Sequence, residues 1–333
     1  MGYSIDVQLV RRITIVDGPS RHRAFPALAL LANGDMLVAY REGSDHWRSA
    51  DGAVRIARST DGGTRWSEPA TVYEEAGVRC GCHHGLAELS NGKLILPFTR
   101  LLETTPHRQE LWIVTSKDGA EHWSDPVRIA PQPGWTWHNQ YGKAVEARPG
   151  VVLVGGGGEL ESQPLGTWDT GCYVSCDYGE SWTKRVTLGV GLDDEKDICR
   201  LSDGRYLALI RDGSNTRRLW KTFSQDPTSR WSPVESTPIY GHCPALVALP
   251  DGLVLVLHRQ VHPDQPPGMA MSYSDDLGLT WREGPMLYRG ANWDCSYPSA
   301  VLLPSGELFC AYYTSFVNGN STIEGVGFRV RRT

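Results

Sequence analysis

The sequence predicts an all-β fold, a six-bladed β-propeller of four-stranded antiparallel blades, from three observations. A motif of the form Ser-x-Asp-x-Gly-x-x-Trp recurs, and its last residues, Trp66, Trp123, Trp182, Trp231 and Trp281, are 57, 59, 49 and 50 residues apart. A repeat of this size is typical of solenoids and propellers. Short apolar strand-like runs are frequent, and helical apolar periodicity is scarce. Glycine (36) and proline (21) are abundant in the 333 residues, which suits a chain with many turns.

The motif itself predicts a turn between two strands. Its four clear copies begin at Ser59, Ser116, Ser175 and Ser274, and a degenerate copy at Ser224 has lost the glycine. We expect the Asp carboxylate to accept hydrogen bonds from turn amides, the glycine to adopt a left-handed backbone, and the Trp to pack on neighbouring structure. The motif is therefore a fold element rather than a catalytic one.

Six units precede or accompany these turns, and each has an apolar strand, a hairpin centred on glycine and a second apolar strand. The strand pairs are 26–31 with 36–40, 85–89 with 94–98, 143–147 with 151–154, 198–201 with 206–210, 245–249 with 253–257, and 299–303 with 308–312. In the first five units a third strand, such as 54–57 or 111–114, leads into the motif and a fourth strand, such as 69–73.

The sixth unit ends at 323–330 without the motif, so we expect 6–16 to supply its last strand. This pairing would close the ring and remove its exposed edges. Residues 1–333 are then predicted to form a single propeller.

Composition limits the partners. The net charge of −5 is spread without long charge runs, which argues against a nucleic-acid footprint or a membrane-surface patch. No apolar stretch reaches the length of a bilayer span, and the first residues lack the order of a secretion signal. We expect a cytoplasmic protein unless a signal precedes this sequence, and a homo-oligomer is compatible with it.

The eight cysteines are expected to be small buried residues rather than a disulfide framework. Cys80-Gly81-Cys82-His83-His84 resembles a set of metal ligands, but its spacing is tighter than that of the usual zinc pairs. We therefore expect neither a metal ion nor another cofactor.

Function is expected where first strands begin and second strands end, because these ends share one face of an up-and-down blade. Arg41, Arg211 and Arg259 each stand seven residues after the hairpin glycine of their unit. Three guanidiniums aimed at one pocket suit the binding of a carboxylate or another anion. Polar residues at the entries of first strands are further candidates for substrate binding or proton transfer, namely Arg23, His83, His84, Tyr141, Glu195, His242, Asp294 and Tyr297.

Propellers with Ser-x-Asp-x-Gly-x-x-Trp motifs resemble the sialidase superfamily, and the resemblance covers essentially the whole chain. It implies a Tyr nucleophile assisted by a Glu, an Asp acid/base and three arginines that hold the sugar carboxylate. By position, Tyr297 corresponds to the nucleophile, Glu195 to its partner and Arg211 to one arginine, and Asp45 or Asp51 to the acid/base. The Arg-Ile-Pro motif of the family is altered here to Arg23-Ala24-Phe25-Pro26.

The resemblance therefore predicts an exo-acting glycoside hydrolase that removes a terminal, acidic sugar from a carbohydrate substrate. Arg41, Arg211 and Arg259 would hold the anion, and His84 and His242 are alternative acid/base groups. A polysaccharide lyase acting on a uronic acid through His or Tyr is an alternative, because the predicted pocket is rich in histidine. A carbohydrate-binding propeller without activity is another, since non-enzymatic propellers carry the same motif.

Overall fold

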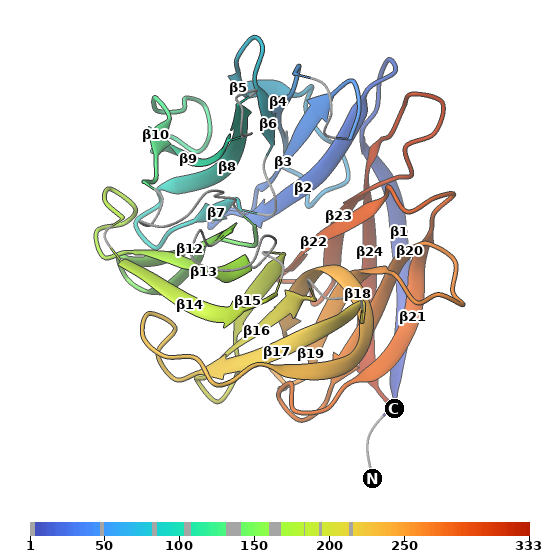
Figure 1. Ribbon diagram of the computed structural model, residues 1–333. Helices are drawn as coiled ribbons and strands as arrows, with labels where there is room; N and C mark the ends of the chain where they lie inside the picture. Colours follow the sequence, from blue (N-terminus) through green and yellow to red (C-terminus); the bar gives the residue numbers. More distant parts are fainter. Residues whose placement is uncertain are drawn as a thin grey trace.

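The structure is a computed structural model, in which the strands form a ring of sheets around a central region (Figure 1). It describes residues 4–46, 50–81, 85–102, 108–130, 141–159, 168–182, 184–192, 195–212 and 216–333. Every regular element in these ranges is a β-strand, so the predicted all-β class is confirmed. The described residues contain no helix long and apolar enough to cross a membrane.

Three sheets follow the predicted units directly. One contains β2 (His22–Leu30), β3 (Met36–Gly43), β4 (Ala53–Ser59) and β5 (Ala70–Glu74) in that order. The next contains β6 (Arg79–Gly81), β7 (Ala87–Glu88), β8 (Leu94–Leu102), β9 (Arg108–Ser116) and β10 (Val127–Arg128). The third contains β11 (Val145–Arg148), β12 (Val151–Glu159), β13 (Trp168–Ser175) and β14 (Lys184–Val190). In the second sheet the first strand is split, because β6 and β7 both pair with β8.

The fourth and fifth predicted units lie in one seven-stranded sheet. Its strands are β15 (Lys196–Arg200), β16 (Tyr206–Arg211), β17 (Arg218–Ser224), β18 (Glu235–Ala248), β19 (Val254–Gln260), β20 (Gly268–Ser274) and β21 (Arg282–Arg289). The long β18 joins the two units, since its first half pairs with β17 and its second half with β19. Within the described ranges the strands thus form five sheets in a propeller-like arrangement, and the count of six blades stays a prediction.

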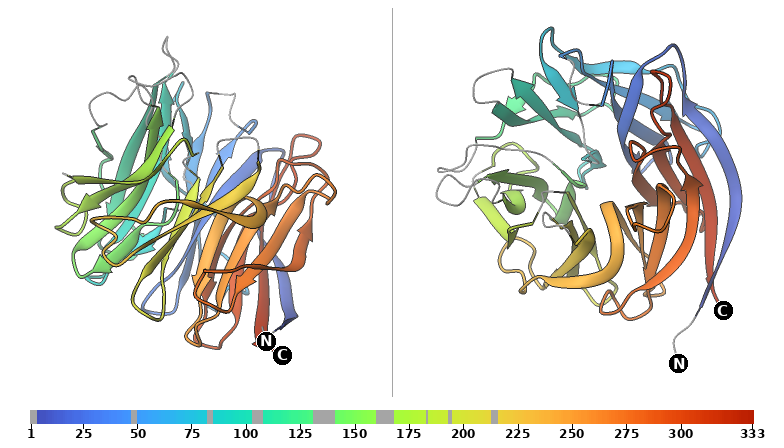
Figure 2. Two further views of the ribbon diagram at one scale, coloured as in Figure 1. Left: turned by 60° about the horizontal axis from the view of Figure 1, so that its bottom comes forward. Right: turned by 45° about the vertical axis from the view of Figure 1, so that its right-hand side comes forward.

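The two ends of the chain share the last sheet. β22 (Ser296–Leu302), β23 (Leu308–Tyr313), β24 (Ile323–Arg332) and β1 (Ile5–Val16) are hydrogen-bonded in that order. β1 runs antiparallel to β24 from Ile5 opposite Arg332 to Val16 opposite Ile323, along the outer edge of the ring (Figure 2). The predicted closure by the N-terminal segment is confirmed.

The motif turns have the predicted hydrogen bonds. Asp61 Oδ1 accepts from the backbone amides of Thr64 at 3.0 Å and Arg65 at 2.8 Å, while Ser59 Oγ accepts from the Gly63 amide at 2.9 Å. Asp118, Asp177 and Asp276 each accept from the amide four residues on, at 3.0, 2.9 and 2.8 Å. These local bonds fix the turn between the third and fourth strands, whatever surrounds it.

The left-handed backbone spans two consecutive positions of each clear copy rather than one. The fourth and fifth residues have positive φ angles in all four copies, and these pairs are Gly62 with Gly63, Gly119 with Ala120, Tyr178 with Gly179, and Leu277 with Gly278. Three non-glycine residues therefore accept a conformation that normally favours glycine. For Tyr178 and Leu277, packing against the core offsets the conformational cost of the positive φ angle.

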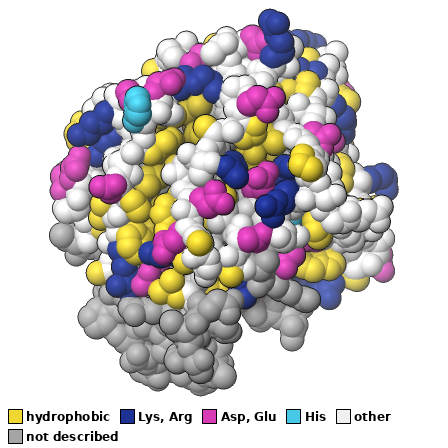
Figure 3. Space-filling model, turned by 90° about the horizontal axis from the view of Figure 1, so that it is seen from above, with side chains coloured by type: hydrophobic (Ala, Val, Ile, Leu, Met, Phe, Trp, Pro, Cys, Tyr) yellow, Lys and Arg dark blue, Asp and Glu magenta, His cyan; other side chains and the backbone are white. Residues whose placement is uncertain are grey.

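Apolar side chains fill the space between neighbouring sheets. Phe25 and Met36 of the β2–β3 sheet belong to one buried cluster with Phe309 and Tyr313 of β23. Trp66 of the first motif stacks on Phe309, with ring centroids 6.3 Å apart. The motif tryptophan thus joins one sheet to the next, as expected. Among the described side chains of the face seen in Figure 3, positive and negative charges are interspersed.

The register also separates two ends of each sheet. Ser59 at the motif end of β4 lies opposite Met36, and Ala53 at the other end lies opposite Glu42. The motif turns therefore lie at one end of the strands, and the starts of first strands and the ends of second strands lie at the other. The candidate site occupies this second end, called the site end below.

Candidate active site

Three predicted residues meet on one carboxylate at the site end. Glu195 lies directly before β15, Arg211 ends β16 and Tyr297 lies in β22. The Tyr297 hydroxyl donates a hydrogen bond to Glu195 Oε1 at 2.6 Å, and Arg211 Nη1 forms an ion pair with the same oxygen at 2.7 Å. The structure therefore brings these three residues from distant segments together, while their roles stay predictions.

The second oxygen of Glu195 is held as firmly as the first. Glu195 Oε2 accepts from the backbone amide of Cys243 at 3.0 Å and lies 3.2 Å from its sulfur. Burial raises the pKa of the Glu195 carboxyl, but the charges of Arg211 and Arg259 outweigh burial and hold this pKa below its usual range. Glu195 is thus an ionised, buried carboxylate that faces a phenol.

Tyr297 is buried among rings. Its ring lies 4.8 Å from that of Phe25 and 5.9 Å from that of Tyr141, and the guanidinium of Arg259 lies over it at 4.8 Å. Burial raises the pKa of Tyr297 well above its ordinary value, and the negative charge of Glu195 adds to this rise. The phenol is therefore neutral at pH 7.

Three first strands reach this point through the same bulge. Phe25, Cys243 and Tyr297 have φ angles of 59°, 54° and 45°, and each directly precedes a proline. The pairing registers of β2, β18 and β22 shift at these residues. Such bulges aim side chains at active sites, and non-glycine residues with positive φ angles carry strain that surrounding contacts must hold.

A cationic cavity of about 520 Å³ lies beside the Glu195–Tyr297 pair. Its lining includes Arg211, Arg259 and His242, which the sequence predicts, and Arg217 and Trp293, which the sequence argument does not assign to anion binding. Burial and the positive charge of Arg211 together lower the pKa of His242 to about 3, so this imidazole is neutral at pH 7. The cavity therefore offers three guanidiniums to an anion.

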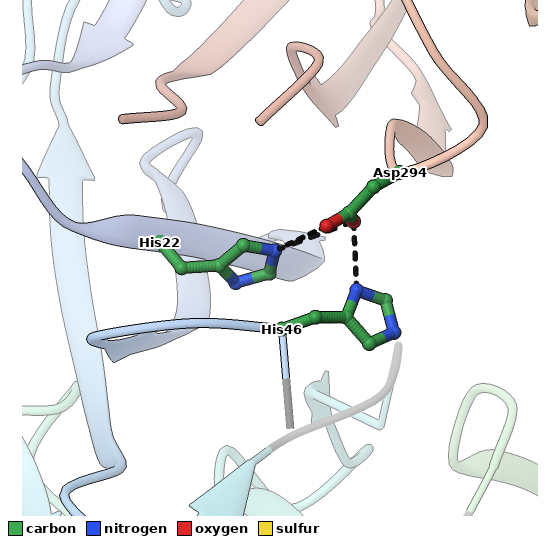
Figure 4. Close-up of side chains that lie close together, drawn as sticks. All are labelled: His22, His46 and Asp294. Atoms are coloured by element: carbon green, nitrogen blue, oxygen red, sulfur yellow. Dashed lines mark hydrogen bonds and ion pairs between the residues drawn. The ribbon is translucent and has the colours of Figure 1, made fainter. Parts of the chain in front are cut away.

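A second group, the Asp294 cluster, consists of His22, His46, Asp294 and Tyr313. Asp294 accepts from His22 Nε2 at 3.2 Å and from His46 Nδ1 at 2.7 Å (Figure 4). The Tyr313 hydroxyl donates to the same carboxylate at 2.8 Å. Burial raises the pKa of Asp294, but the bonds from His22 and His46 outweigh it and keep the carboxyl ionised. The sequence argument does not assign His22 and His46 to the site. The pattern that could have identified them is an aspartate before one first strand together with histidines near another.

The two N-terminal arginines bind elsewhere. Arg23 pairs with Glu42 at 3.0 Å and donates to Asn320 at 3.0 Å. Arg41 is buried and donates to the backbone oxygen of Asp45 at 2.6 Å. Neither lines the cavity that holds Arg211 and Arg259. The β2 bulge explains this placement, because it turns Phe25 rather than an arginine toward Tyr297.

The remaining predicted residues divide into three groups. Tyr141 packs beneath Tyr297, so it belongs to the site. Asp51 pairs with Arg21 at 2.8 Å and accepts from the Ser44 amide at 3.1 Å, in the same loop as Asp45. His83 and His84 lie outside the described residues. The structure brings Asp45 and Asp51 near β3, while their roles stay predictions.

The Asp294 cluster also has the composition of a metal site. His22, His46 and Asp294 each offer a ligand atom, and these atoms lie within 4.8 Å of one another. Both histidine nitrogens already lie at hydrogen-bond distance from the carboxylate. Proton-mediated contacts account for this geometry without an ion, so we do not assign a metal here.

The family model for the BNR repeat-like domain matches residues 34–310. The chain belongs to this family, within the sialidase superfamily. The resemblance that the Ser-x-Asp-x-Gly-x-x-Trp motifs indicate is thus confirmed by the match to the family model.

One curated protein and two solved structures are similar to this chain. A curated sialidase of Micromonospora viridifaciens is 26% identical over 86% of this chain, which spans about half (49%) of that protein. A crystal structure of a protein of unknown function from Dyadobacter fermentans has a TM-score of 0.79 at 18% identity, covering 98% of this chain and 99% of that one. The Hadza microbial sialidase Hz136 has a TM-score of 0.73 at 18% identity, covering 93% of this chain and 65% of that one. The structural likenesses show a shared fold.

Proposed function

We propose that this BNR repeat-like protein is an exo-acting glycoside hydrolase that removes a terminal acidic sugar. The observation that carries the proposal is the 2.6 Å hydrogen bond from the Tyr297 hydroxyl to Glu195, beside a cavity lined by Arg211, Arg217 and Arg259. A tyrosine paired with a buried carboxylate suits nucleophilic attack, and clustered guanidiniums suit a sugar carboxylate. The membership in the sialidase superfamily supports the same reaction class.

We also propose that residues 1–333 form one propeller of six blades. The seven-stranded sheet divides naturally within β18, because Arg218 of β17 lies opposite Tyr240 and Gln260 of β19 lies opposite the next residue, Gly241. This division gives two four-stranded units that share one continuous strand. A crystal structure with a blade count other than six would contradict the proposal.

In the first step, Tyr297 Oη bonds to the anomeric carbon while its proton passes to Glu195. The bond from that carbon to the leaving oxygen breaks, and an acid supplies a proton to this oxygen. Asp45 or Asp51, from the loop after β3, is the candidate that the family resemblance gives for this acid. A neutral phenol suits an anionic sugar, because a carboxylate nucleophile would be repelled by the substrate.

In the second step, water attacks the anomeric carbon, and the bond from that carbon to Tyr297 Oη breaks. The acid, now deprotonated, accepts a proton from the water, and Glu195 returns its proton to the Tyr297 oxygen. The sugar leaves with the hydroxyl of water, and both groups regain their starting charge. Arg211 stabilises Glu195 while it is ionised, at the start and the end of each turnover.

The test is a panel of 4-methylumbelliferyl glycosides with sialyl, uronyl and neutral deoxysugar groups. We expect wild type to cleave an acidic member of the panel and Tyr297→Phe to lose at least about a thousandfold in kcat, because the nucleophile is gone. The matched control is Tyr206→Phe, since the Tyr206 hydroxyl donates to the Ala147 backbone at 2.9 Å away from the site.

Wild-type inactivity on every member of the panel would overturn the hydrolase proposal. Retained sugar binding by both wild type and Tyr297→Phe without any turnover would indicate a carbohydrate-binding propeller instead. Equal losses in Tyr206→Phe and Tyr297→Phe would point to a general effect on folding, which the melting temperatures of both variants would reveal.

A lyase acting on a uronic acid is the second candidate, favoured by the neutral His242 in the wall of the cationic cavity. The imidazole would take the proton next to a carboxylate held by Arg211 and Arg259. A double bond would form as the carbon–oxygen bond to the leaving group breaks, and the leaving oxygen would take a proton from water. The match to the BNR repeat-like family and the sialidase relative support hydrolysis instead, which ranks this reaction second. An ultraviolet-absorbing product from a uronate polymer would reverse the ranking.

A further inference from the structure

The two histidines of the Asp294 cluster differ in their surroundings. The side chain of His22 is fully buried, and its ring packs on Phe316 with centroids 4.8 Å apart. The side chain of His46 is 31% exposed, and it contacts the carboxylate through Nδ1. His22 therefore holds Asp294 from inside the protein, whereas His46 connects Asp294 to the surface of the site.

The hydrogen bond to Asp294 determines how His46 presents its ring. With Nδ1–H donated to an ionised carboxylate at 2.7 Å, Nε2 is left as the atom that gains and loses a proton. This nitrogen faces away from Asp294 (Figure 4). The same arrangement, a carboxylate holding Nδ1 and a reactive Nε2, makes histidine an acid/base group in other enzymes.

His46 also stands beside the cavity and the nucleophile. Its ring lies 5.4 Å from that of Trp293, which lines the cavity, and 5.2 Å from that of Phe25. Phe25 in turn packs against Tyr297 at 4.8 Å. His46 and Tyr297 thus both pack against the ring of Phe25, which places the imidazole in the immediate surroundings of the nucleophile.

The loop after β3 also carries the two carboxylate candidates for the acid, Asp45 and Asp51. Asp51 accepts hydrogen bonds from Arg21 and from the amide and hydroxyl of Ser44, so its carboxylate stabilises this loop. The backbone oxygen of Asp45 accepts a hydrogen bond from the buried Arg41. His46 follows Asp45 directly in the chain, so the same loop delivers a different proton carrier to the site.

We propose that His46, oriented by Asp294, is the acid/base residue of this site in place of a carboxylate. The inference rests on the proposed hydrolase function and names the group that handles the leaving-group proton. In the first step, His46 Nε2–H gives its proton to the leaving oxygen as the Tyr297–sugar bond forms. In the second, neutral His46 takes a proton from the attacking water, which restores the imidazolium beside ionised Asp294.

The orientation can be tested without a substrate. We expect long-range ¹H–¹⁵N spectra of histidine-labelled protein to show neutral His46 protonated at Nδ1, with the signal assigned through His46→Gln. In Asp294→Asn this tautomer should be lost while the melting temperature shows a folded protein. Protonation of neutral His46 at Nε2 in wild type would overturn the proposal.

The chemical role can be tested by comparing leaving groups. The probes are the 4-methylumbelliferyl glycoside that wild type cleaves and the corresponding methyl glycoside, whose leaving oxygen needs a proton. In His46→Ala we expect kcat/KM on the methyl glycoside to fall about 10²–10⁴-fold and that on the aryl glycoside to fall far less. His122→Gln, at an exposed motif turn, serves as the matched control.

The same variant should accumulate the glycosyl–tyrosine species. We expect His46→Ala to release a burst of one fluorophore per enzyme, followed by slow turnover that azide accelerates, since azide attacks without a base. Equal losses on both glycosides and no burst would overturn the role of His46. Activity that a chelator removes and Zn²⁺ restores would overturn it too, in favour of a metal on His22, His46 and Asp294.

Failure of this inference is separable from failure of the proposed function. If wild type cleaves no glycoside of the panel, the hydrolase proposal falls. If wild type is active and depends on Tyr297 while His46→Ala behaves like His122→Gln, only the assignment of the acid/base falls.

Discussion

The motif turns and the site end of the same sheets use carboxylates in opposite ways. At the motif turns, Asp61 binds amides three and four residues away. At the site end, Glu195 binds groups 48 and 102 residues away, and Asp294 binds a histidine 272 residues away. The first kind of contact forms within a single turn, whereas the second forms only when the ring is assembled.

Charge therefore matters more at the site end than at the motif turns. The motif carboxylates stand in solvent-accessible turns that remain hydrogen-bonded to their own backbone. Glu195 is 4% exposed, so its charge depends on guanidiniums that come from other segments. A buried charge that loses its partner is far costlier than an exposed one. Substitutions at the site end should therefore have larger effects than matched substitutions at the motif turns.

The largest effect is expected for Glu195→Gln. The variant leaves Arg211 and Arg259 without their counter-charge and removes the acceptor of the Tyr297 proton, so kcat should fall about a thousandfold or more and stability by about 3 kcal/mol. Asp177→Asn makes the same chemical change at a motif turn and should keep activity. Steady-state kinetics and urea unfolding of both variants measure the contrast, and similar losses in the two would break it.

Arg259→Met should act next most strongly, and on one substrate class. Loss of a charge-assisted contact to a carboxylate costs about 10–100-fold in kcat/KM. We expect this loss on acidic glycosides and little change on neutral ones, if the cavity holds the sugar carboxylate. Arg58→Met, which removes an ion pair with Asp35 near a motif turn, is the control. Equal losses on acidic and neutral sugars would contradict anion binding.

Lowering the pH should weaken the site end through His258. This residue is 2% exposed in β19, and burial lowers its pKa to about 4. The unfolded chain binds a proton near pH 6.5 and the folded chain does not, so stability is fully present above pH 6.5 and is lost as pH falls toward 4. Between pH 7 and 4.5 the loss is about 2.5 kcal/mol.

Urea unfolding at both pH values measures this loss. His258→Gln removes the titrating group, so its stability should decline less steeply with falling pH than that of wild type. Parallel declines in the two proteins would show that His258 binds its proton equally well in the folded and unfolded chains.

The smallest effect is expected at the second motif. Ala120 has a φ of 76°, where the other clear copies have glycine, so Ala120→Gly should stabilise the protein by up to about 1 kcal/mol. The reverse change, Gly63→Ala, should destabilise it, because a Cβ would meet Met36 at 3.2 Å and Phe309 at 3.3 Å. Thermal unfolding of both variants gives the signs, and activity should stay unchanged.

Local features account for what the sequence predicts well. The motif turns and the strand pairs depend on residues a few positions apart, so their spacing identifies them directly. Tyr297, Glu195 and Arg211 are also predictable, because each holds an equivalent position at the edge of a strand in a repeating unit. Because the units repeat, the position of a residue within its own unit predicts which residues of other units lie near it.

The other parts of the site depend on features that no single unit reveals. The β2 bulge places Phe25 against Tyr297 and leaves Arg23 to Glu42, and Arg217 rather than Arg41 joins Arg211 and Arg259 at the cavity. His46 and Asp294 meet across 248 residues with no shared spacing. Likewise, nothing in the residues of β18 distinguishes one continuous strand from two. The proline after each bulged residue was the one available signal for Phe25, Cys243 and Tyr297.

The shared sheet of β1 and β24 has a consequence for synthesis on the ribosome. β1 leaves the ribosome about 300 residues before β24, the strand that completes its hydrogen bonds. At about 5–20 residues per second this interval is roughly 15–60 s. We therefore expect β1 of the nascent chain to keep an open edge during this interval, until β24 emerges and pairs with it.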